Sequence, residues 1–144
     1  MTAATVLDSE DTIETEIRRT ARTTKEASRV LALADVATKN GALRAAAAAI
    51  RVRSVDIIAA NDRDMAAAGE RDLTFAFKDR LKLTVERVEA MAAGLEAIAE
   101  RDDPVGKLID EWTRPNGLHI SRVSVPLGVI GIIYESRPNV TADA

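Results

Sequence analysis

Residues 122–144 read RVSVPLGVIGIIYESRPNVTADA and contain the longest uncharged apolar run of the chain, residues 125–134. The run is rich in Val and Ile, whose β-branched side chains favour a strand. Apolar and polar residues do not alternate in it, so we expect a strand buried on both faces, as in the centre of a parallel α/β sheet. Ligands of such sheets bind beyond the carboxyl ends of the strands. We therefore look for chemistry in residues 135–141.

The residues before this stretch change from helical to strand periodicity near Pro104. Apolar side chains recur at helical spacing over residues 12–100. The pattern predicts a first helix over 12–35 and a second apolar stripe over 43–58. Asn40–Gly41 between them is typical of a break, and the alternative is two nearly continuous helices. A short helix is expected to start at Asn61–Asp62 and stop at Gly69, another to span 73–80, and a last one, capped by Thr84, to end at 102–104.

A β-hairpin is expected after the helices. Trp112–Thr113 and residues 118–125 have strand character, and Asn116–Gly117 between them suits a type I′ turn. The alternation of the return strand is imperfect, which predicts a bulge near Ser121–Arg122. Helices, a hairpin and the first strand of a parallel sheet give an incomplete α/β fold.

Four segments of the sequence resemble one enzyme family. They are VPLGVIGIIYESRPNVTADA at 125–144, DRLKLT at 79–84, DPVG at 103–106 and WTRPNGL at 112–118. Their order of Gly, Pro and charged residues closely resembles the γ-glutamyl phosphate reductases, also called glutamate-5-semialdehyde dehydrogenases, of the aldehyde dehydrogenase superfamily. The resemblance implies an aldehyde-dehydrogenase-like fold in three parts. These are an N-terminal helical part (1–104), a hairpin of the oligomerisation subdomain (105–125) and the start of the dinucleotide-binding domain (126–144).

The same resemblance implies an activity. It is the NADPH-dependent reduction of L-glutamyl 5-phosphate to L-glutamate 5-semialdehyde and phosphate in proline biosynthesis, by a homo-oligomer whose pathway partner is glutamate 5-kinase. Members of the family are longer and use a cysteine nucleophile, whereas this chain has 144 residues and no Cys. We therefore expect an N-terminal fragment that is inactive alone, with an open strand edge that favours self-association.

Asn139 and Arg137 are the candidate site residues. The resemblance implies that Asn139 donates a hydrogen bond to the oxyanion that develops on the substrate carbonyl. Arg137 suits pairing with the phosphate or carboxylate of the substrate. The same resemblance implies that Tyr134, Glu135 and Ser136 lie near the nicotinamide. For Arg137 and Asn139 the alternative interpretation is a purely structural turn.

The composition of the chain bears on which classes of function and location it fits. A net charge of −3 argues against a nucleic-acid surface, and no apolar segment suits a signal peptide or a membrane span, so we expect a cytoplasmic protein. His119, a lone histidine, is typical of a surface strand, and Asp102–Asp103 before a proline are typical of a solvated helix end, so we predict no metal. Because the chain lacks a nucleophile, a catalytically inactive helical and hairpin association module remains the alternative function.

Overall fold

The computed structural model describes residues 3–71 and 73–144, with side chains from residue 12 onward. The chain divides into two compact units, Met1–Ala34 with Pro104–Gly131, and Asp35–Asp103 with Ile132–Ala144. No helix in the described part of the chain is both long enough and apolar enough to cross a membrane.

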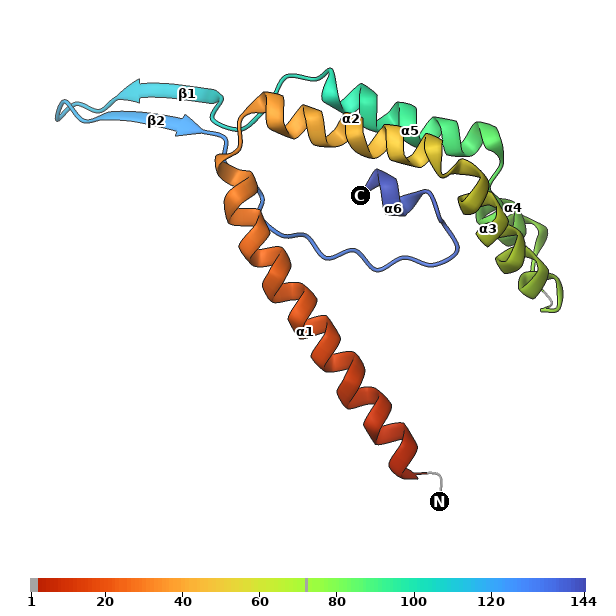
Figure 1. Cartoon of the computed structure of the whole chain (residues 1–144). Coiled ribbons are helices and arrows are strands. Elements are labelled where there is room, and N and C mark those ends of the chain that lie inside the picture. Colours follow the sequence, from red (N-terminus) through yellow and green to blue (C-terminus); the bar gives the residue numbers. More distant parts are fainter. Residues whose placement is uncertain (1–2, 72) are drawn as a thin grey trace. The chain divides into compact units, whose positions relative to one another are not determined.

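The second unit is a small helical assembly. Helices α2 (Val36–Val52) and α5 (Val85–Ala99) lie side by side, and α3 (Ser54–Gly69) leads to the short α4 (Phe75–Leu81) (Figure 1). Ala47 of α2 and Ala92 of α5 are fully buried, because small side chains let helices approach closely. The core consists of Leu83, Val88 and Met91, with Ile50, Ile57, Ile58 and Ala142 packed against it.

Side-chain caps start three of these helices. Thr84 accepts a hydrogen bond from the Arg87 backbone N–H, which confirms its predicted capping role, and Thr74 caps α4 in the same way. Asp35 caps α2 by accepting from the Thr38 N–H at 2.7 Å, and this hydrogen bond lowers the pKa of its carboxyl group.

Two predicted helix boundaries are wrong. The break before α2 lies at Ala34–Asp35 because Asp35 provides the cap, and Asn40–Gly41 lies inside the helix. Glycine there costs only about 1 kcal/mol relative to alanine. Asn61 does not start a helix: α3 begins at Ser54, and Asn61 is buried in its middle.

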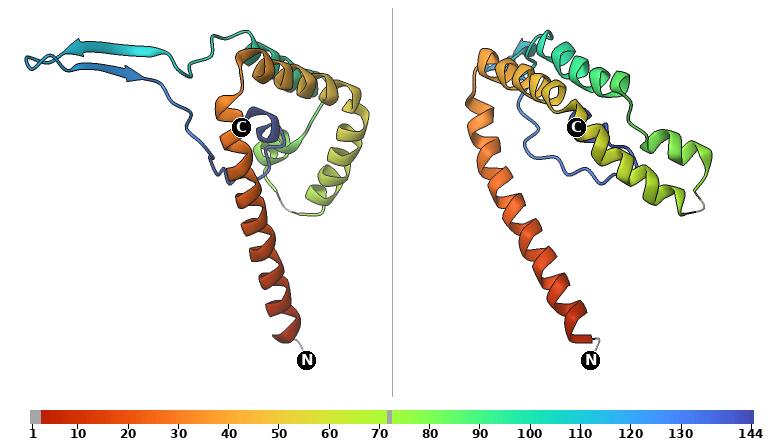
Figure 2. Two further views of the ribbon diagram at one scale, coloured as in Figure 1. Left: turned by 60° about the vertical axis from the view of Figure 1, so that its left-hand side comes forward. Right: turned by 45° about the vertical axis from the view of Figure 1, so that its right-hand side comes forward.

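The first unit contains the long helix α1 (Ala3–Leu33) and the predicted hairpin. Strands β1 (Leu108–Thr113) and β2 (His119–Val123) pair antiparallel, as the left view of Figure 2 shows. The type I′ turn is wrong, because the Gly117 N–H donates to the Arg114 oxygen at 2.9 Å and Asn116 does not have a positive φ. Pro115 suits the second position of a type I turn, and Gly117 follows at φ +84°. The irregularity in the ladder falls in β1, between Leu108 and Asp110.

The strand predicted over residues 125–133 is not formed. Residues 124–135 have no regular secondary structure, and Gly128 has a φ of +86° (Figure 1). Leu127 and Ile133 are 88% and 103% exposed. A central strand needs neighbours on both edges, and the two strands in the described part of the chain pair with each other. In the described part of the chain, the apolar run therefore has no neighbouring strand with which to pair.

Candidate functional site

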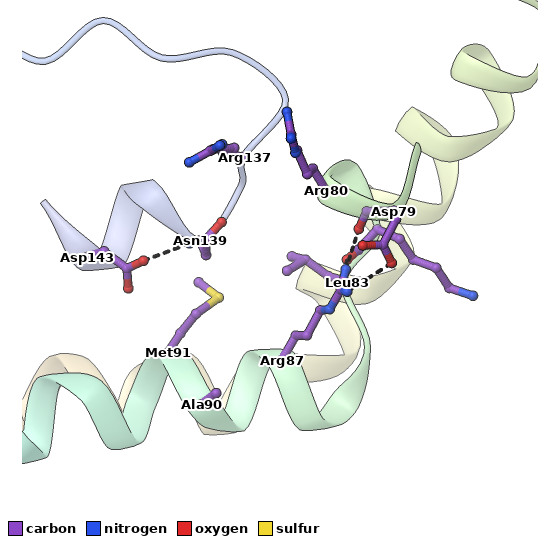
Figure 3. A pocket seen from close by; sticks show the side chains of 10 residues that line it. Asp79, Arg80, Leu83, Arg87, Ala90, Met91, Arg137, Asn139 and Asp143 are labelled. Carbon is purple, nitrogen blue, oxygen red and sulfur yellow. Dashed lines mark hydrogen bonds and ion pairs between the residues drawn. The ribbon is translucent and has the colours of Figure 1, made fainter. Parts of the chain in front are cut away.

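The residues after the apolar run return to the helical unit and line a pocket. Helix α6 (Val140–Asp143) contacts α5, and its Ala142 packs against the core around Leu83 and Met91. Beside it lies a pocket of about 380 Å³ (Figure 3). Its lining residues are Asp79, Arg80, Lys82, Leu83, Arg87, Ala90, Met91, Arg137, Asn139 and Asp143.

Asn139 is half-buried at the start of α6. Its side-chain nitrogen donates a hydrogen bond to the Asp143 carboxylate, with 2.7 Å between Nδ2 and Oδ2. Figure 3 shows the Asn139 amide above Met91 of α5, with Asp143 on one side and Arg80 on the other. A primary amide carries two N–H donors. Asp143 takes one of them, and within residues 12–71 and 73–144 the side chain makes no other hydrogen bond.

The three residues before Arg137 turn the chain into this position. Ser136 has a φ of +55°, a left-handed conformation that non-glycine residues adopt in only a few per cent of cases. The Tyr134 hydroxyl lies 2.6 Å from the Thr141 hydroxyl of α6. Tyr134, Glu135 and Ser136 are not among the residues that line the pocket, whereas Arg137 and Asn139 are. The structure thus brings together two of the five predicted site residues.

The opposite wall of the pocket comes from the turn between α4 and α5. The Asn61 side chain donates to the Leu81 oxygen at 2.8 Å and accepts from the Leu83 N–H at 2.7 Å. Arg87 donates to the backbone oxygens of Asp79 and Lys82 and pairs with the Asp79 carboxylate at 3.0 Å. These bonds satisfy the last carbonyls of α4, and they fix the direction of the turn.

The charges of the pocket favour an anion. Its cations are Arg80, Lys82, Arg87 and Arg137, and its anions are Asp79 and Asp143. Arg87 and Asp79 neutralise each other, and Asp143 is hydrogen-bonded to Asn139. The side chains of Arg80, Lys82 and Arg137 have no ion-pair or hydrogen-bond partner in the described part of the chain. Guanidinium groups match the geometry of phosphate and carboxylate.

Sequence reasoning missed the α4–α5 wall. The segment DRLKLT at 79–84 was noticed only as part of the family resemblance. No local pattern marks Arg80 or Lys82 as neighbours of Arg137, because more than fifty positions along the chain separate them. His119 lies on β2, with its ring nitrogens hydrogen-bonded to Glu111 and Thr113, and it lines no part of this pocket. Residues 12–71 and 73–144 hold no cluster suited to a metal ion.

The described residues do not by themselves contain the turn and helix of a dinucleotide site. Such a site cradles a diphosphate with the backbone N–H groups of a tight turn that opens a helix. Residues 124–135 are irregular, and the helix that follows has four residues. The irregular segment and the four-residue helix therefore lack the turn and helix that cradle a diphosphate.

Relatives of known name match most of the chain. No protein-family model matches it. It is 62% identical over 120 residues to the γ-glutamyl phosphate reductase of Gluconobacter oxydans, a match that covers 83% of this chain and 28% of that protein. It is 58% identical over 134 residues to the reductase of Paramagnetospirillum magneticum, covering 93% of this chain and 31% of that one.

Two solved structures are similar in fold. The γ-glutamyl phosphate reductase of Thermotoga maritima has a TM-score of 0.82 at 42% identity, over 88% of this chain and 31% of that one. The Saccharomyces cerevisiae enzyme has a TM-score of 0.80 at 31% identity, over 85% of this chain and 31% of that one. The resemblance inferred from residues 125–144 is confirmed, as is the fold of helices and hairpin. The chain spans about 28–31% of the length of these relatives.

Proposed function

We propose that this chain supplies one wall of the active site of an NADPH-dependent reductase that converts L-glutamyl 5-phosphate to L-glutamate 5-semialdehyde and phosphate in proline biosynthesis. The observation that carries the proposal is the pocket in which Asn139 and Arg137 meet the cations of the α4–α5 turn. The relatives that match the chain at 58–62% identity are named for this activity.

Asn139 has the chemistry of an oxyanion donor. Attack on the acyl carbon places negative charge on the carbonyl oxygen, and a preorganised N–H aimed at that oxygen stabilises the transition state. The hydrogen bond to Asp143 fixes the amide of Asn139 and leaves its second N–H for the substrate. Because the group is held before the reaction begins, little reorganisation is needed when the charge develops.

Arg137 has the chemistry of an anion-binding residue. The substrate carries an acyl phosphate and an α-carboxylate, and a guanidinium group binds either of them through paired hydrogen bonds. The Arg137 side chain lines the same pocket as Asn139, two residues away in sequence. It would therefore orient the acyl group against the oxyanion donor.

The nucleophile and the hydride of the proposed reaction are not supplied by residues of this chain. The sequence has no Cys, so the thiolate nucleophile of the proposed reaction must come from other residues. Hydride would come from NADPH, to which residues 134–136 would contribute contacts. We further propose the three-part division at residues 104 and 125, a cytoplasmic homo-oligomer held by the hairpin, and pathway coupling to glutamate 5-kinase.

The alternative is a non-catalytic association module. It was motivated by the missing nucleophile. The relatives reported above are all named as reductases, and no described feature of the chain favours the alternative.

A chimeric enzyme tests the proposal. The matching 120 residues of the Gluconobacter oxydans reductase are replaced by those of this chain, which are 62% identical to them. We expect the chimera to reduce NADP⁺ in the presence of glutamate 5-semialdehyde and phosphate, the reverse of the proposed reaction. The 144-residue chain alone, assayed in parallel, should be inactive. A folded chimera without turnover would contradict the proposal and favour the association module.

A further inference from the structure

We propose that Arg80 is a second anion-binding residue of the pocket and that, together with Arg137, it binds a phosphate or carboxylate group. This inference deepens the proposed function and rests on it only for the identity of the natural ligand. Neither the sequence pattern nor any named relative assigns a role to Arg80.

Arg80 lines the same pocket as Arg137. It lies in the last turn of α4, and Figure 3 shows its side chain extending toward the loop that carries Arg137. Both residues are exposed, and both line the pocket of about 380 Å³. This is large enough for a small charged metabolite.

The side-chain donors of the neighbouring Arg87 are occupied, whereas those of Arg80 are not. Arg87 donates hydrogen bonds to the backbone carbonyls of Asp79 and Lys82 and to the Asp79 carboxylate. These bonds hold the turn from which Arg80 projects. The side chain of Arg80 makes no hydrogen bond or ion pair with any residue that the structure describes. Its donors therefore remain for a ligand.

The two negative charges of the pocket, Asp79 and Asp143, leave the end near Arg80 positive. Asp143 lies on the other side of Asn139 from Arg80 in Figure 3, and Asp79 is neutralised by Arg87. An anion is therefore repelled from the Asp143 end of the pocket and attracted to the end formed by Arg80, Lys82 and Arg137. This places the anionic group of a ligand across Asn139 from Asp143.

A binding experiment on the 144-residue chain tests the inference without any need for turnover. Inorganic phosphate and L-glutamate are titrated separately, and the backbone amide signals of residues 79–83 and 137–143 are followed by NMR. Saturable shifts in both segments with phosphate alone identify the phosphoryl end of a ligand, and shifts with glutamate alone identify its carboxylate. Either result supports the inference. If neither anion causes saturable shifts in either segment, the inference is overturned.

Variants separate Arg80 from a general charge effect. We expect Arg80→Gln to weaken the binding of the effective anion about tenfold or more, as for the loss of a hydrogen bond to a charged group. Arg80→Lys should restore part of it. Arg63→Gln, the same charge change at an exposed α3 residue outside the pocket, is the matched control and should bind like the parent. Equal weakening by Arg63→Gln and Arg80→Gln would also overturn the inference.

The chimera distinguishes this inference from the proposed function. There, Arg80→Gln and Arg137→Ala should raise KM for phosphate in the reverse reaction and leave kcat nearly unchanged. An inactive chimera whose phosphate binding still depends on Arg80 would remove the proposed function and keep the inference. An active chimera in which Arg80→Gln leaves KM for phosphate unchanged would keep the proposed function and remove the inference.

Discussion

The side-chain amide of Asn139 donates a hydrogen bond to the carboxylate of Asp143, one helical turn further along, with 2.7 Å between nitrogen and oxygen. This bond uses one N–H of the amide and sets the direction of the other. The pair stands at the edge of a pocket whose remaining charges are mostly positive. Asn139 is therefore held in place by the short helix that it begins.

Replacing Asn139 by Ala should lower kcat of the chimera by about 100- to 1,000-fold, because the oxyanion loses a donor that acts mainly in the transition state. KM should change far less. Steady-state kinetics, with the concentration of each substrate varied in turn, measures the changes in kcat and in KM separately. If kcat stayed within about threefold of the parent, Asn139 would not be the oxyanion donor.

Replacing Asp143 by Ala should have a smaller effect of the same kind. The amide of Asn139 loses its orienting acceptor and keeps its donors, so we expect kcat to fall about 2- to 10-fold with KM nearly unchanged. Asp143→Asn retains a carbonyl acceptor and should recover most of the rate. An effect on KM alone would show that Asp143 contacts the ligand and does not position Asn139.

Replacing Asn61 by Ala should destabilise the helical unit by about 1–3 kcal/mol, because the part-buried Leu81 carbonyl and the buried Leu83 N–H each lose their partner. Asn61 is 3% exposed, and it bonds the backbone of both Leu81 and Leu83. Chemical denaturation of the chain followed by circular dichroism gives the free energy of unfolding. Asp62→Ala, at the exposed neighbouring residue, should change it by less than about 0.5 kcal/mol. Equal losses in the two variants would contradict the role of Asn61.

Helices α2 and α5 are joined by an ion-pair cluster at Arg51. One guanidinium nitrogen lies 2.7 Å from a Glu89 oxygen and 2.8 Å from a Glu96 oxygen. Hydrogen bonds from Arg51 lower the pKa of both carboxyls from their usual 4.5. We expect Arg51→Gln to lower Tm, whereas Arg53→Gln, whose exposed contact with Asp56 is 3.8 Å long, should not.

The pH dependence of this cluster follows from the sign of the shifts. Because Glu89 and Glu96 hold their protons less tightly in the folded chain, their contribution to stability is complete above pH 4.5 and is lost as the pH falls through their lower folded pKa. The difference in Tm between parent and Arg51→Gln should therefore shrink in that acidic range. A difference that stayed constant from neutral pH to below both pKa values would exclude the ion pairs as its cause.

The exposed apolar residues of the segment 125–133 should make the isolated chain self-associate. Leu127 and Ile133 are almost completely exposed, and contiguous apolar surface of this kind promotes association. Light scattering across a concentration series should show species larger than a monomer. Leu127→Glu combined with Ile133→Lys should shift the distribution toward the monomer, while Lys107→Glu should not. A stable monomer at all concentrations would contradict this prediction.

Local chemistry made much of this protein predictable from its sequence. Thr84 caps a helix because its hydroxyl meets an N–H three residues on, and Gly117 marks the hairpin because it tolerates a positive φ. The order of helices and hairpin follows from such signals and from periodicity. Asn139 and Arg137 could be chosen as site candidates because they follow an apolar run, and because the segment around them resembles a known family.

Only the tertiary structure decided the rest. Asn61 is a helix-starting residue by type, but its side chain bonds the backbone of Leu81 and Leu83 some twenty positions away, and this keeps it in mid-helix. The β-branched run over 125–133 has the propensity of a strand, but a strand forms only where another strand accepts its hydrogen bonds. The pocket joins residues 79–91 to residues 137–143 because Ala142 packs on the core at Leu83 and Met91. The sequence alone determined which residues carry donors and charges, and long-range packing determined which of them meet.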